Sequence, residues 1–437
     1  MVDHARSDDP AVQLQLDRLT ALSPGRDTLG LERITELLDR LGNPHRSLPP
    51  VFHVAGTNGK GSTCAFLRAA IEAAGLTAHV YTSPHLVRFN ERIRLAGKLV
   101  SDERLATLLA ETLDCAEGIN PSFFEATTAA AFLAFSRTPA DACVIEVGLG
   151  GRLDATNVIE RPLVAGIAHL GIDHEGFLGS DIAVIASEKA GIAKRGRALV
   201  TQEYPEPLAG PIERTAQDNG AEWIARGRDW MGAAYRGILH YRDSENRYRL
   251  PLPGLAGAHQ ADNALLAIAM LSHQREIIVP EGALKAAMGW ADWPARLQQL
   301  GSGPLTSLLP SDGSLWLDGG HNVLAANVLA EHFSETPSLH LVMGMLANKD
   351  PAGFLTPLAG IAKSATFVPV DGHACHSPET LARIAADLGI RGDTASGLEI
   401  AVAKFGSGSA GDRETIAIIG SLYLAGEALR LNGYIPE

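Results

Sequence analysis

The residues best suited to chemistry lie together in one short segment, Gly56-Thr57-Asn58-Gly59-Lys60-Gly61-Ser62-Thr63. Glycines let the backbone turn tightly and direct N–H groups at phosphate oxygens, and a following helix adds its positive end. Lys60 can reach terminal phosphates, and Ser62 or Thr63 can support the phosphates or a metal ion. The spacing departs from the common GxxxxGK[ST] pattern because Gly61 follows Lys60 directly. The segment predicts a phosphate-binding loop, with an empty glycine-rich turn as the structural alternative.

The elements on either side of this segment are those that such a loop needs. Residues 51–55 are apolar and predict a strand, and residues 64–74 predict a helix. Helix-like segments separate further strands, which are expected at 78–82, 142–147 and 163–169. The first fifty residues read as helices. This alternation predicts a mostly parallel α/β sheet that binds ligands at the carboxyl ends of its strands.

A second α/β region is expected toward the C-terminus. The pattern pauses near residues 294–298 and at Gly301-Ser302-Gly303-Pro304. It then resumes with strands expected at 314–317, 339–343, 365–370 and 415–419. We therefore predict a P-loop-containing domain over residues 1–297, a linker over 298–304 and a smaller, Rossmann-like α/β domain over 305–437.

Composition limits the classes of function. The chain has 437 residues, 46% of them hydrophobic, and a formal net charge of −13, which opposes nucleic acid and anionic membranes. Phosphate capture must therefore come from local structure. The four cysteines form no CxxC pair, and the sequence shows neither a signal peptide nor an apolar run long enough to span a membrane. We expect a cytoplasmic monomer with small-molecule substrates.

Two other motifs have less specific readings. Asn348-Lys349-Asp350 comes close to a guanine-reading motif, but its aspartate stands one position early. His373-Ala374-Cys375-His376 offers two imidazoles and one thiol, which favours an exposed loop over a zinc site. Neither motif displaces the phosphate loop as the centre of the chemistry.

Several further segments follow the loop along nearly the whole chain: Tyr81-Thr82-Ser83-Pro84-His85-Leu86, Asn90-Glu91-Arg92-Ile93-Arg94, Phe124-Glu125-Ala126-Thr127, residues 146–157, residues 172–179, Glu188-Lys189-Ala190-Gly191-Ile192, Asp318-Gly319-Gly320-His321-Asn322, Gly344-Met345 and Gly420-Ser421-Leu422-Tyr423. In content and order, they resemble the folylpolyglutamate synthase/dihydrofolate synthase family of the Mur-ligase superfamily, in its bacterial bifunctional form.

This resemblance implies an ATP-dependent ligase that adds L-glutamate to dihydropteroate and to folate γ-carboxyls through an acyl phosphate, with Mg²⁺ as cofactor. It implies an ATP- and pterin-binding first domain, a glutamate-ligase second domain, and an active site between them that closes on substrate. Folylpolyglutamate synthase activity alone, a Mur-type cell-wall ligase and a non-enzymatic P-loop switch are the alternatives. The cell-wall ligases carry an extra domain before the loop, and few residues precede Gly56 here.

By motif position, the resemblance implies metal ligands at Ser83, Glu146 and His174, and a carbamylated Lys189. Each position also has an ordinary structural reading. Ser83 suits a turn, Glu146 suits an ion pair or a helix cap, and Lys189 suits a solvated helix face. His174 is the least expected ligand on chemical grounds, because Mg²⁺ prefers oxygen.

The remaining site residues are also implied by motif position. ATP contacts are expected at Thr57, Asn58, Gly59, Lys60, Gly61, Ser62, Thr63, Asn263, Arg296 and Asp318. Pterin contacts are expected at Leu29, Gly30, Phe124, Arg152, Leu153 and Asp154. Catalytic roles are expected at Lys60, Lys189, His174 and His321, with His321 and Ser421 near the glutamate. Asn263 also suits a helix N-cap, and Phe124 also suits ordinary core packing.

Overall fold

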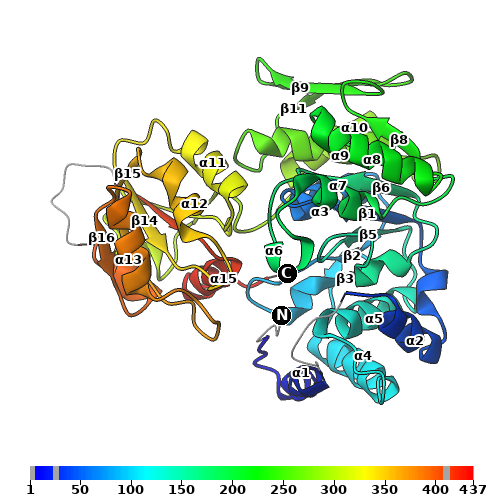
Figure 1. Cartoon of the computed structure of the whole chain (residues 1–437), viewed down its shortest axis with the longest axis horizontal. Coiled ribbons are helices and arrows are strands. Elements are labelled where there is room, and N and C mark those ends of the chain that lie inside the picture. The colour runs from blue at the N-terminus through cyan, green and yellow to red at the C-terminus, as the bar shows by residue number, and fades with distance from the viewer. Residues whose placement is uncertain (1–4, 23–28, 407–413, 437) are drawn as a thin grey trace. The chain divides into compact units, whose positions relative to one another are not determined.

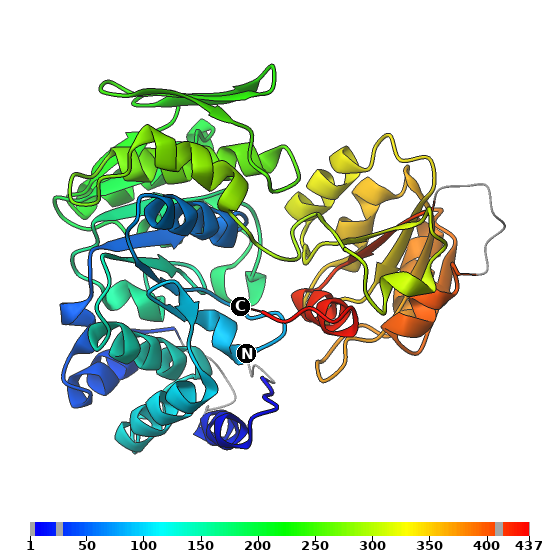
Figure 2. The same ribbon diagram turned by 180° about the vertical axis from the view of Figure 1, so that it is seen from behind.

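The computed structural model describes residues 5–22, 29–406 and 414–436. The chain folds as two compact units, which Figures 1 and 2 show from opposite sides. The first unit runs to Gly254 and includes Ala258–Asp292, and the second comprises Leu255–Gly257 and Trp293–Pro436. Each unit is built on a mostly parallel sheet flanked by helices, so the predicted fold class is confirmed.

The main sheet of the first unit has the strand order β4-β3-β2-β5-β1-β6-β7-β8. The strands from β2 to β8 in this order are parallel, whereas β3 and β4 pair antiparallel at one edge. Their bounds are β1 Val51–Ala55, β2 Ala78–Tyr81, β3 Ile93–Leu95, β4 Lys98–Leu99, β5 Ala142–Glu146, β6 Val164–Ile167, β7 Ala198–Thr201 and β8 Glu222–Ala225. The central strands are buried along their whole length, which explains their continuous apolar sequences.

Helices cover this sheet, and a separate three-stranded antiparallel ribbon packs on two of them. The helices are α1 Pro10–Leu22, α2 Glu32–Arg40, α3 Lys60–Ala73, α4 Asp102–Cys115, α5 Phe123–Ser136, α6 Glu175–Leu178, α7 Ile182–Ala190, α8 Glu206–Asp218, α9 His259–Ser272 and α10 Glu281–Trp290, with 3₁₀ turns η1 Pro44–Ser47, η2 Phe89–Arg92 and η3 Ala155–Val158. The ribbon strands are β9 Met231–Tyr235, β10 Ile238–Arg242 and β11 Arg247–Pro251. The ribbon was not predicted from the sequence.

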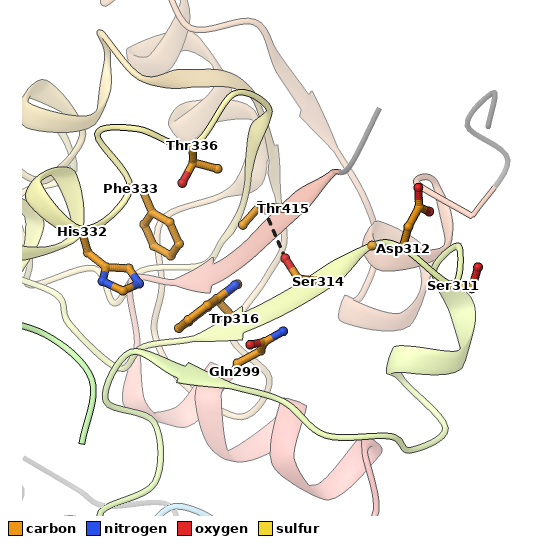
Figure 3. Close-up of a pocket in the computed structure, with 10 residues that line it drawn as sticks. Gln299, Ser311, Asp312, Ser314, Trp316, His332, Phe333, Thr336 and Thr415 are labelled. Atoms are coloured by element: carbon orange, nitrogen blue, oxygen red, sulfur yellow. Dashed lines mark hydrogen bonds between the residues drawn. The ribbon is translucent and has the colours of Figure 1, made fainter. Parts of the chain in front are cut away.

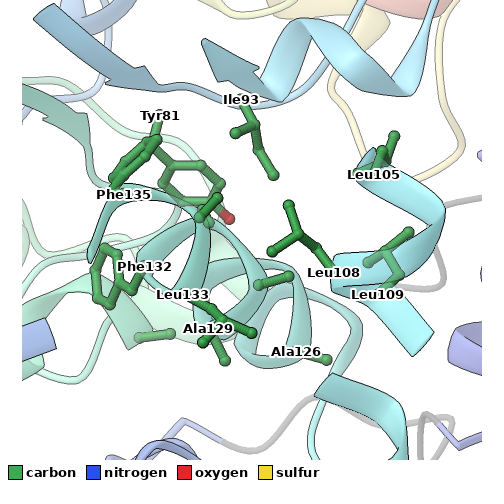
Figure 4. Close-up of a cluster of buried hydrophobic side chains, with 14 of the residues drawn as sticks. Tyr81, Ile93, Leu105, Leu108, Leu109, Ala126, Ala129, Phe132, Leu133 and Phe135 are labelled. Carbon is green, nitrogen blue, oxygen red and sulfur yellow. The ribbon is translucent and has the colours of Figure 1, made fainter. Parts of the chain in front are cut away.

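Helix α5 forms the centre of a large apolar core between the sheet and α4 (Figure 4). Nearly all of its side chains from Phe123 to Phe135 are buried, as expected for a helix that is apolar on every side. Phe132 and Phe135 are at most 1% exposed, and burying each such ring stabilises the fold by about 1.5–3 kcal/mol. A capping box between Ser122 and Glu125 fixes where the helix begins. The core thereby holds Phe124, at the start of this helix, in a fixed position.

The second unit contains a sheet of order β12-β13-β17-β14-β15-β16, parallel except at β12. Its elements are β12 Gln298–Gln299, β13 Ser314–Leu317, β14 Leu339–Met343, β15 Ala362–Phe367, β16 Gly392–Thr394, β17 Thr415–Ile419, α11 Val323–His332, α12 Pro351–Leu355, α13 Pro378–Asp387, α14 Leu398–Ala403, α15 Leu422–Leu431, and the 3₁₀ turns η4 Thr306–Leu308 and η5 Thr356–Leu358.

Three segments differ from the sequence-based expectation. Strand β15 begins three residues earlier than expected, and Gln298–Gln299, placed in a linker, pair with β13 instead. Helix α3 begins at Lys60 rather than at Cys64, directly after the glycine turn. Across the described ranges of the chain, each helix is too short or too polar to cross a lipid bilayer.

Candidate active site

The carboxyl ends of the central strands of the first unit meet at the predicted phosphate loop. Strand β1 lies between β5 and β6, and β2 lies on the far side of β5. The chain leaves β1 through Gly56, and β5 ends at Glu146. The connection that leaves β1 leads to β2 on one side of it, and the connection that leaves β5 leads to β6 on the other. Open α/β sheets bind ligands where the strand order reverses in this way.

Three hydrogen bonds hold the loop against the segment that follows β6. The N–H groups of Thr57 and Asn58 both donate to the carbonyl oxygen of His169, at N···O distances of 2.8 and 3.2 Å. The Thr57 hydroxyl also donates to the carbonyl oxygen of Gly171, at 2.8 Å. These contacts with the neighbouring segment fix the shape of the loop.

Gly59 connects this loop to α3 in a conformation that suits only glycine. Its φ is +84°, and a Cβ at this position would lie 2.3 Å from Asn263 Oδ1. Gly59 is the N-cap residue of the helix that follows, and it has no side chain with which to cap that helix. The positive end of the α3 dipole is thus left for an anion, as phosphate binding requires.

Two lysine side chains converge on one carbonyl oxygen of the loop. Lys60 Nζ lies 3.1 Å from Gly56 O and 3.2 Å from Thr57 O. Lys189 Nζ, from α7, lies 3.0 Å from the same Gly56 oxygen. Ser62 and Thr63, by contrast, are at most 2% exposed within α3.

Lys189 is buried, and its ionisation is strongly perturbed. Its relative exposure is 4%. Burial lowers the pKa of Lys189 to about 7, with the charge of Lys60 acting in the same direction and Asp173 and Asp154 opposing it. A substantial fraction of these side chains is therefore a neutral amine near pH 7. The solvated-lysine reading of this position is wrong.

Two of the three predicted metal ligands lie in contact. Glu146 is 5% exposed, and its Oε2 accepts a hydrogen bond of 3.2 Å from the N–H of Ser83. His174 caps the start of α6 in the left-handed conformation, with φ +55°.

A group of three or more His, Cys, Asp and Glu side chains able to hold a metal ion does not occur among the described residues, including those around Cys375. The buried Glu146 carboxylate, beside Ser83, nevertheless suits a hard cation, because Mg²⁺ prefers oxygen ligands and takes few of them from protein.

Phe124 stands half-buried at the amino end of α5, beside the strand edge that carries the loop. Its ring lies so close to Gly148 that a Cβ there would be 2.4 Å from Phe124 Cζ. The ring centroid is 5.9 Å from that of Tyr81. One side of the ring is thus held by the turn after β5 while part of it stays accessible.

Asp154 organises the turn that follows β5. It is 3% exposed and accepts hydrogen bonds from the N–H groups of Leu149 and Thr156, at 2.8 and 2.9 Å, and from the Thr156 hydroxyl. Burial raises the pKa of Asp154, and these hydrogen bonds oppose the rise. Its carboxylate is already engaged within the turn.

The residues at the other predicted pterin contacts are exposed or half-buried. Arg152 pairs with Glu188, with 2.9 Å between Nε and Oε1, and Leu153 follows it in the same turn. Leu29 and Gly30 precede α2 and are half-buried.

Asn263 lies inside α9 and not at its start, so the N-cap reading of this residue is wrong. It is fully buried, and its Nδ2 donates to Gln260 Oε1 at 3.0 Å. Its Oδ1, which faces Gly59, has no hydrogen-bond partner within the described part of the chain. A buried acceptor without a partner is costly, which favours a ligand donor at this position.

A second cluster of polar residues lies at the carboxyl edge of the sheet in the second unit. Asp318 follows β13 and accepts hydrogen bonds from the N–H groups of Leu297 and Gly320, at 2.8 and 2.7 Å. A Cβ on Gly319 would lie 3.0 Å from Nη1 of Arg296, which therefore borders the same turn.

His321 and Ser421 belong to the same edge of the second sheet. His321 Nδ1 lies 3.0 Å from Gly319 O, and Ser421 caps α15 directly after β17. Arg296, Asp318, His321 and Ser421 are thus neighbours within the second unit.

The second unit also contains a hollow of about 580 Å³, shown in Figure 3. Trp316, His332 and Phe333 line it, together with Ser314 and Thr415. The last two begin β13 and β17, so the hollow lies toward the amino ends of these strands, away from Asp318 and Ser421. Because the predicted chemistry gathers at the opposite ends, we give this hollow no part in the active site.

Residues 304–431 match the family model described as the C-terminal domain of dihydrofolate synthetase. The chain is 33% identical over 415 residues to the dihydrofolate synthase/folylpolyglutamate synthase of Bacillus subtilis, covering 90% of this chain and 93% of that protein. The chain belongs to the dihydrofolate synthase/folylpolyglutamate synthase family. A relative of the same name from Escherichia coli is 34% identical over 348 residues, covering 79% of this chain and 78% of that protein.

Solved structures of the dihydrofolate synthase/folylpolyglutamate synthase family have the same fold. The Escherichia coli protein in complex with DHPP and ADP superposes with a TM-score of 0.86 at 30% identity, covering 97% of each chain. The Mycobacterium tuberculosis folylpolyglutamate synthase, complexed with ADP and AMPPCP, also gives 0.86, at 31% identity over 98% of this chain and 99% of that one. Another structure, with Mn, AMPPNP and L-glutamate bound, gives 0.84 at 30% identity over 98% of this chain and 99% of that one.

The sequence did not predict the contacts of several residues that shape this site. The carbonyl oxygens of Gly56 and His169 anchor the lysines and the loop, but a backbone atom carries no sequence signal. Glu188 pairs with Arg152, and Asp262 pairs with Arg226 beside Asn263. A signal for His169 existed, because it ends a predicted strand at the sheet edge that carries the loop.

Proposed function

We propose that this chain is an ATP-dependent ligase that joins L-glutamate to dihydropteroate and to the γ-carboxyls of reduced folates. The observation that carries the proposal is the convergence of Lys60 and Lys189 on the carbonyl of Gly56, beside a helix start whose N-cap residue is glycine. Such a site suits the transfer of a phosphoryl group, since it places the Lys60 ammonium and backbone N–H groups where charge accumulates. Family membership adds that relatives of this fold are complexed with ADP, AMPPNP and L-glutamate.

In the proposed reaction, an oxygen of the substrate carboxylate attacks the γ-phosphorus of ATP, and ADP leaves. The amine nitrogen of glutamate then attacks the acyl carbon, loses a proton and expels phosphate. Lys60 is proposed to neutralise the transferring phosphoryl oxygens, and the N–H groups of the loop and of α3 to orient them.

Ser83, Glu146 and His174 would hold a divalent cation. When bound, such a cation neutralises phosphate charge. Lys189 is proposed to carry a carbamate, because its neutral amine can attack CO₂ and lose a proton to give an anion that helps hold metal. Phe124 and the turn at Arg152, Leu153 and Asp154 are proposed to receive the pterin, with Leu29 and Gly30.

The remaining assignments are also proposals. Asn263 is proposed to contact the nucleotide through its unpartnered Oδ1. Within the second unit, Arg296 and Asp318 are proposed to contact the nucleotide, and His321 and Ser421 the glutamate. Residues 305–437 are proposed as the glutamate-ligase domain, and the protein is proposed to act as a cytoplasmic monomer.

The decisive test incubates the protein with ATP, Mg²⁺, L-glutamate and either dihydropteroate or tetrahydrofolate. Glutamate-dependent phosphate release with both acceptors supports the bifunctional enzyme, and release with tetrahydrofolate alone supports the single-activity form. Phosphate release that ignores glutamate would support a nucleotide switch and would refute the ligase.

A paired variant locates the chemistry. Lys60→Ala should lower glutamyl transfer by about 10²–10³-fold, as loss of one transition-state donor does. Lys285→Ala removes an exposed lysine on α10 and should keep full turnover. Equal turnover of folded Lys60→Ala and Lys285→Ala would refute the assignment of the phosphate loop.

A further inference from the structure

The outer face of the β9–β11 ribbon carries an unusual set of side chains. Along β10 and β11, Leu239, Tyr241 and Leu250 are buried against the helices beneath. The alternating positions on the other face are half-buried or exposed: His240, Arg242, Arg247 and Arg249. These four residues, which we name the basic ribbon face, form a cationic surface on a protein with a formal net charge of −13.

The strand register places like charges opposite each other. Arg242 pairs directly with Arg247, and His240 pairs with Arg249. Like charges at directly opposed positions of an antiparallel pair destabilise it. Throughout the described residues, no carboxylate forms an ion pair with Arg242, Arg247 or Arg249. The arrangement therefore favours a bound anion.

The acidic residues of the turn between β10 and β11 do not neutralise these arginines. Asp243 accepts hydrogen bonds from the Tyr241 hydroxyl and from Asn246. Glu245 pairs with Arg275, with 3.0 Å between its Oε1 and the guanidinium Nη2. Both carboxylates are thus already engaged, and the basic ribbon face keeps its charge.

The ribbon is held firmly as a platform. Gly232 of β9 approaches α9 so closely that a Cβ there would lie 2.6 Å from a methyl carbon of Leu265. The carbonyl oxygen of Gly232 accepts a hydrogen bond of 2.6 Å from Arg226. Figures 1 and 2 show the ribbon lying over α9 and α10. Asn263 of the candidate nucleotide site lies on this same helix α9.

We propose that the basic ribbon face binds the oligo-γ-glutamyl tail of folates, a chain of successive carboxylates. This inference rests on the proposed function, which makes such tails. Side chains on one face of a strand recur about every 6.8 Å. An extended γ-linked chain presents one α-carboxylate roughly every 6 Å along its axis, on alternating sides, from ordinary bond lengths. Successive carboxylates of the tail therefore lie at a spacing that the long arginine side chains of the two neighbouring strands can reach.

A polynucleotide is the other polyanion that a cluster of arginines can bind. The net charge of −13 opposes its approach, because a polynucleotide carries a dense and long-ranged charge. A short oligoglutamate has fewer charges and experiences less repulsion. The ribbon therefore favours the oligoglutamate.

The test measures the binding of a fluorophore-labelled γ-linked hexaglutamate, without a pterin, by anisotropy at low salt. The ribbon variant replaces Arg242, Arg247 and Arg249 with alanine. The control variant replaces Arg18, Arg40 and Arg137, which are also at the surface, with alanine. Both variants therefore lose three positive charges. We expect the ribbon variant to bind about tenfold more weakly, because each exposed pair contributes roughly twofold to threefold. Wild type and control should bind equally, and more salt should weaken both.

A single substitution separates binding from folding. Arg242→Gln removes the opposed charge, so the melting temperature should stay level or rise while binding of the hexaglutamate weakens. Transfer of glutamate to dihydropteroate, which has no tail, should be unchanged in every variant.

Several results would overturn the proposal: equal binding by wild type and the ribbon variant, no binding by wild type, or tighter binding of an oligonucleotide than of the hexaglutamate. A wild-type protein that adds no glutamate to either acceptor would refute the proposed function instead. Binding of the hexaglutamate can still be read in that case, so the two failures are distinguishable.

Discussion

Replacing Lys189 with methionine tests whether burial holds this amine near its neutral form. The pKa of Lys189 is lowered to about 7 from 10.5, so between these values the unfolded chain binds more protons than the folded protein. Stability therefore rises with pH across this window. Below pH 7, burying the charged amine lowers the free energy of unfolding by its full amount. Above pH 10.5, this destabilisation disappears. At about 1.4 kcal/mol per pH unit, this lysine adds roughly 2–3 kcal/mol of stability between pH 6 and pH 9.

Methionine has a similar length and no charge, so Lys189→Met should lack this pH-dependent term. Its stability relative to wild type should fall by roughly 2–3 kcal/mol from pH 6 to pH 9. The lost hydrogen bond to Gly56 adds a constant offset of about 1 kcal/mol. The assay is urea unfolding in CO₂-depleted buffer, followed through Trp223 and Trp230 of the first unit.

Lys285→Met serves as the control, because Lys285 is at the surface of α10. Its stability difference from wild type should stay constant over the same pH range. A difference between Lys189→Met and wild type that does not change with pH would refute the reasoning, because the charged amine would then cost nothing to bury.

Three further substitutions probe the geometry of the site. Gly59→Ala should destabilise the protein by about 1–3 kcal/mol, because its φ is positive and the new Cβ meets Asn263; thermal melts with and without ADP should show a lower melting temperature and a smaller shift. Gly148→Ala should displace the ring of Phe124 and raise the KM for dihydropteroate several-fold at constant KM for ATP; an unchanged pterin KM would argue against that ring as a pterin contact. Asp154→Ala leaves two backbone N–H groups without their acceptor and should cost about 2–4 kcal/mol in urea unfolding; a loss below 1 kcal/mol would show that water replaces the carboxylate.

Much of the fold could be predicted because local pattern and tertiary environment agree. Strands β1, β13, β14 and β17 occupy the expected residues. Each is a short, largely apolar run, as expected for a mostly buried parallel strand. The phosphate loop was also predictable, since its glycines are required by a conformation that other residues rarely adopt.

The ribbon was not predictable in the same way. Its first turn, Arg236-Gly237, has positive φ at both residues, and arginine is an uncommon choice there. Its strands carry glycine, alanine and arginine in place of a clear apolar alternation. Their pairing depends on packing against α9 and α10, which the local sequence does not encode.

The sequence by itself determined the family, the order of the motifs and the residue types that the chemistry needs. Only the tertiary structure decided which of these groups touch. Lys189 meets Gly56 across 133 positions of sequence, and Glu146 meets Ser83 across 63. The order of strands in the sheet creates these contacts, and burial sets the pKa of Lys189. Desolvation depends on everything packed around a side chain, so no pattern within one helix could have revealed it.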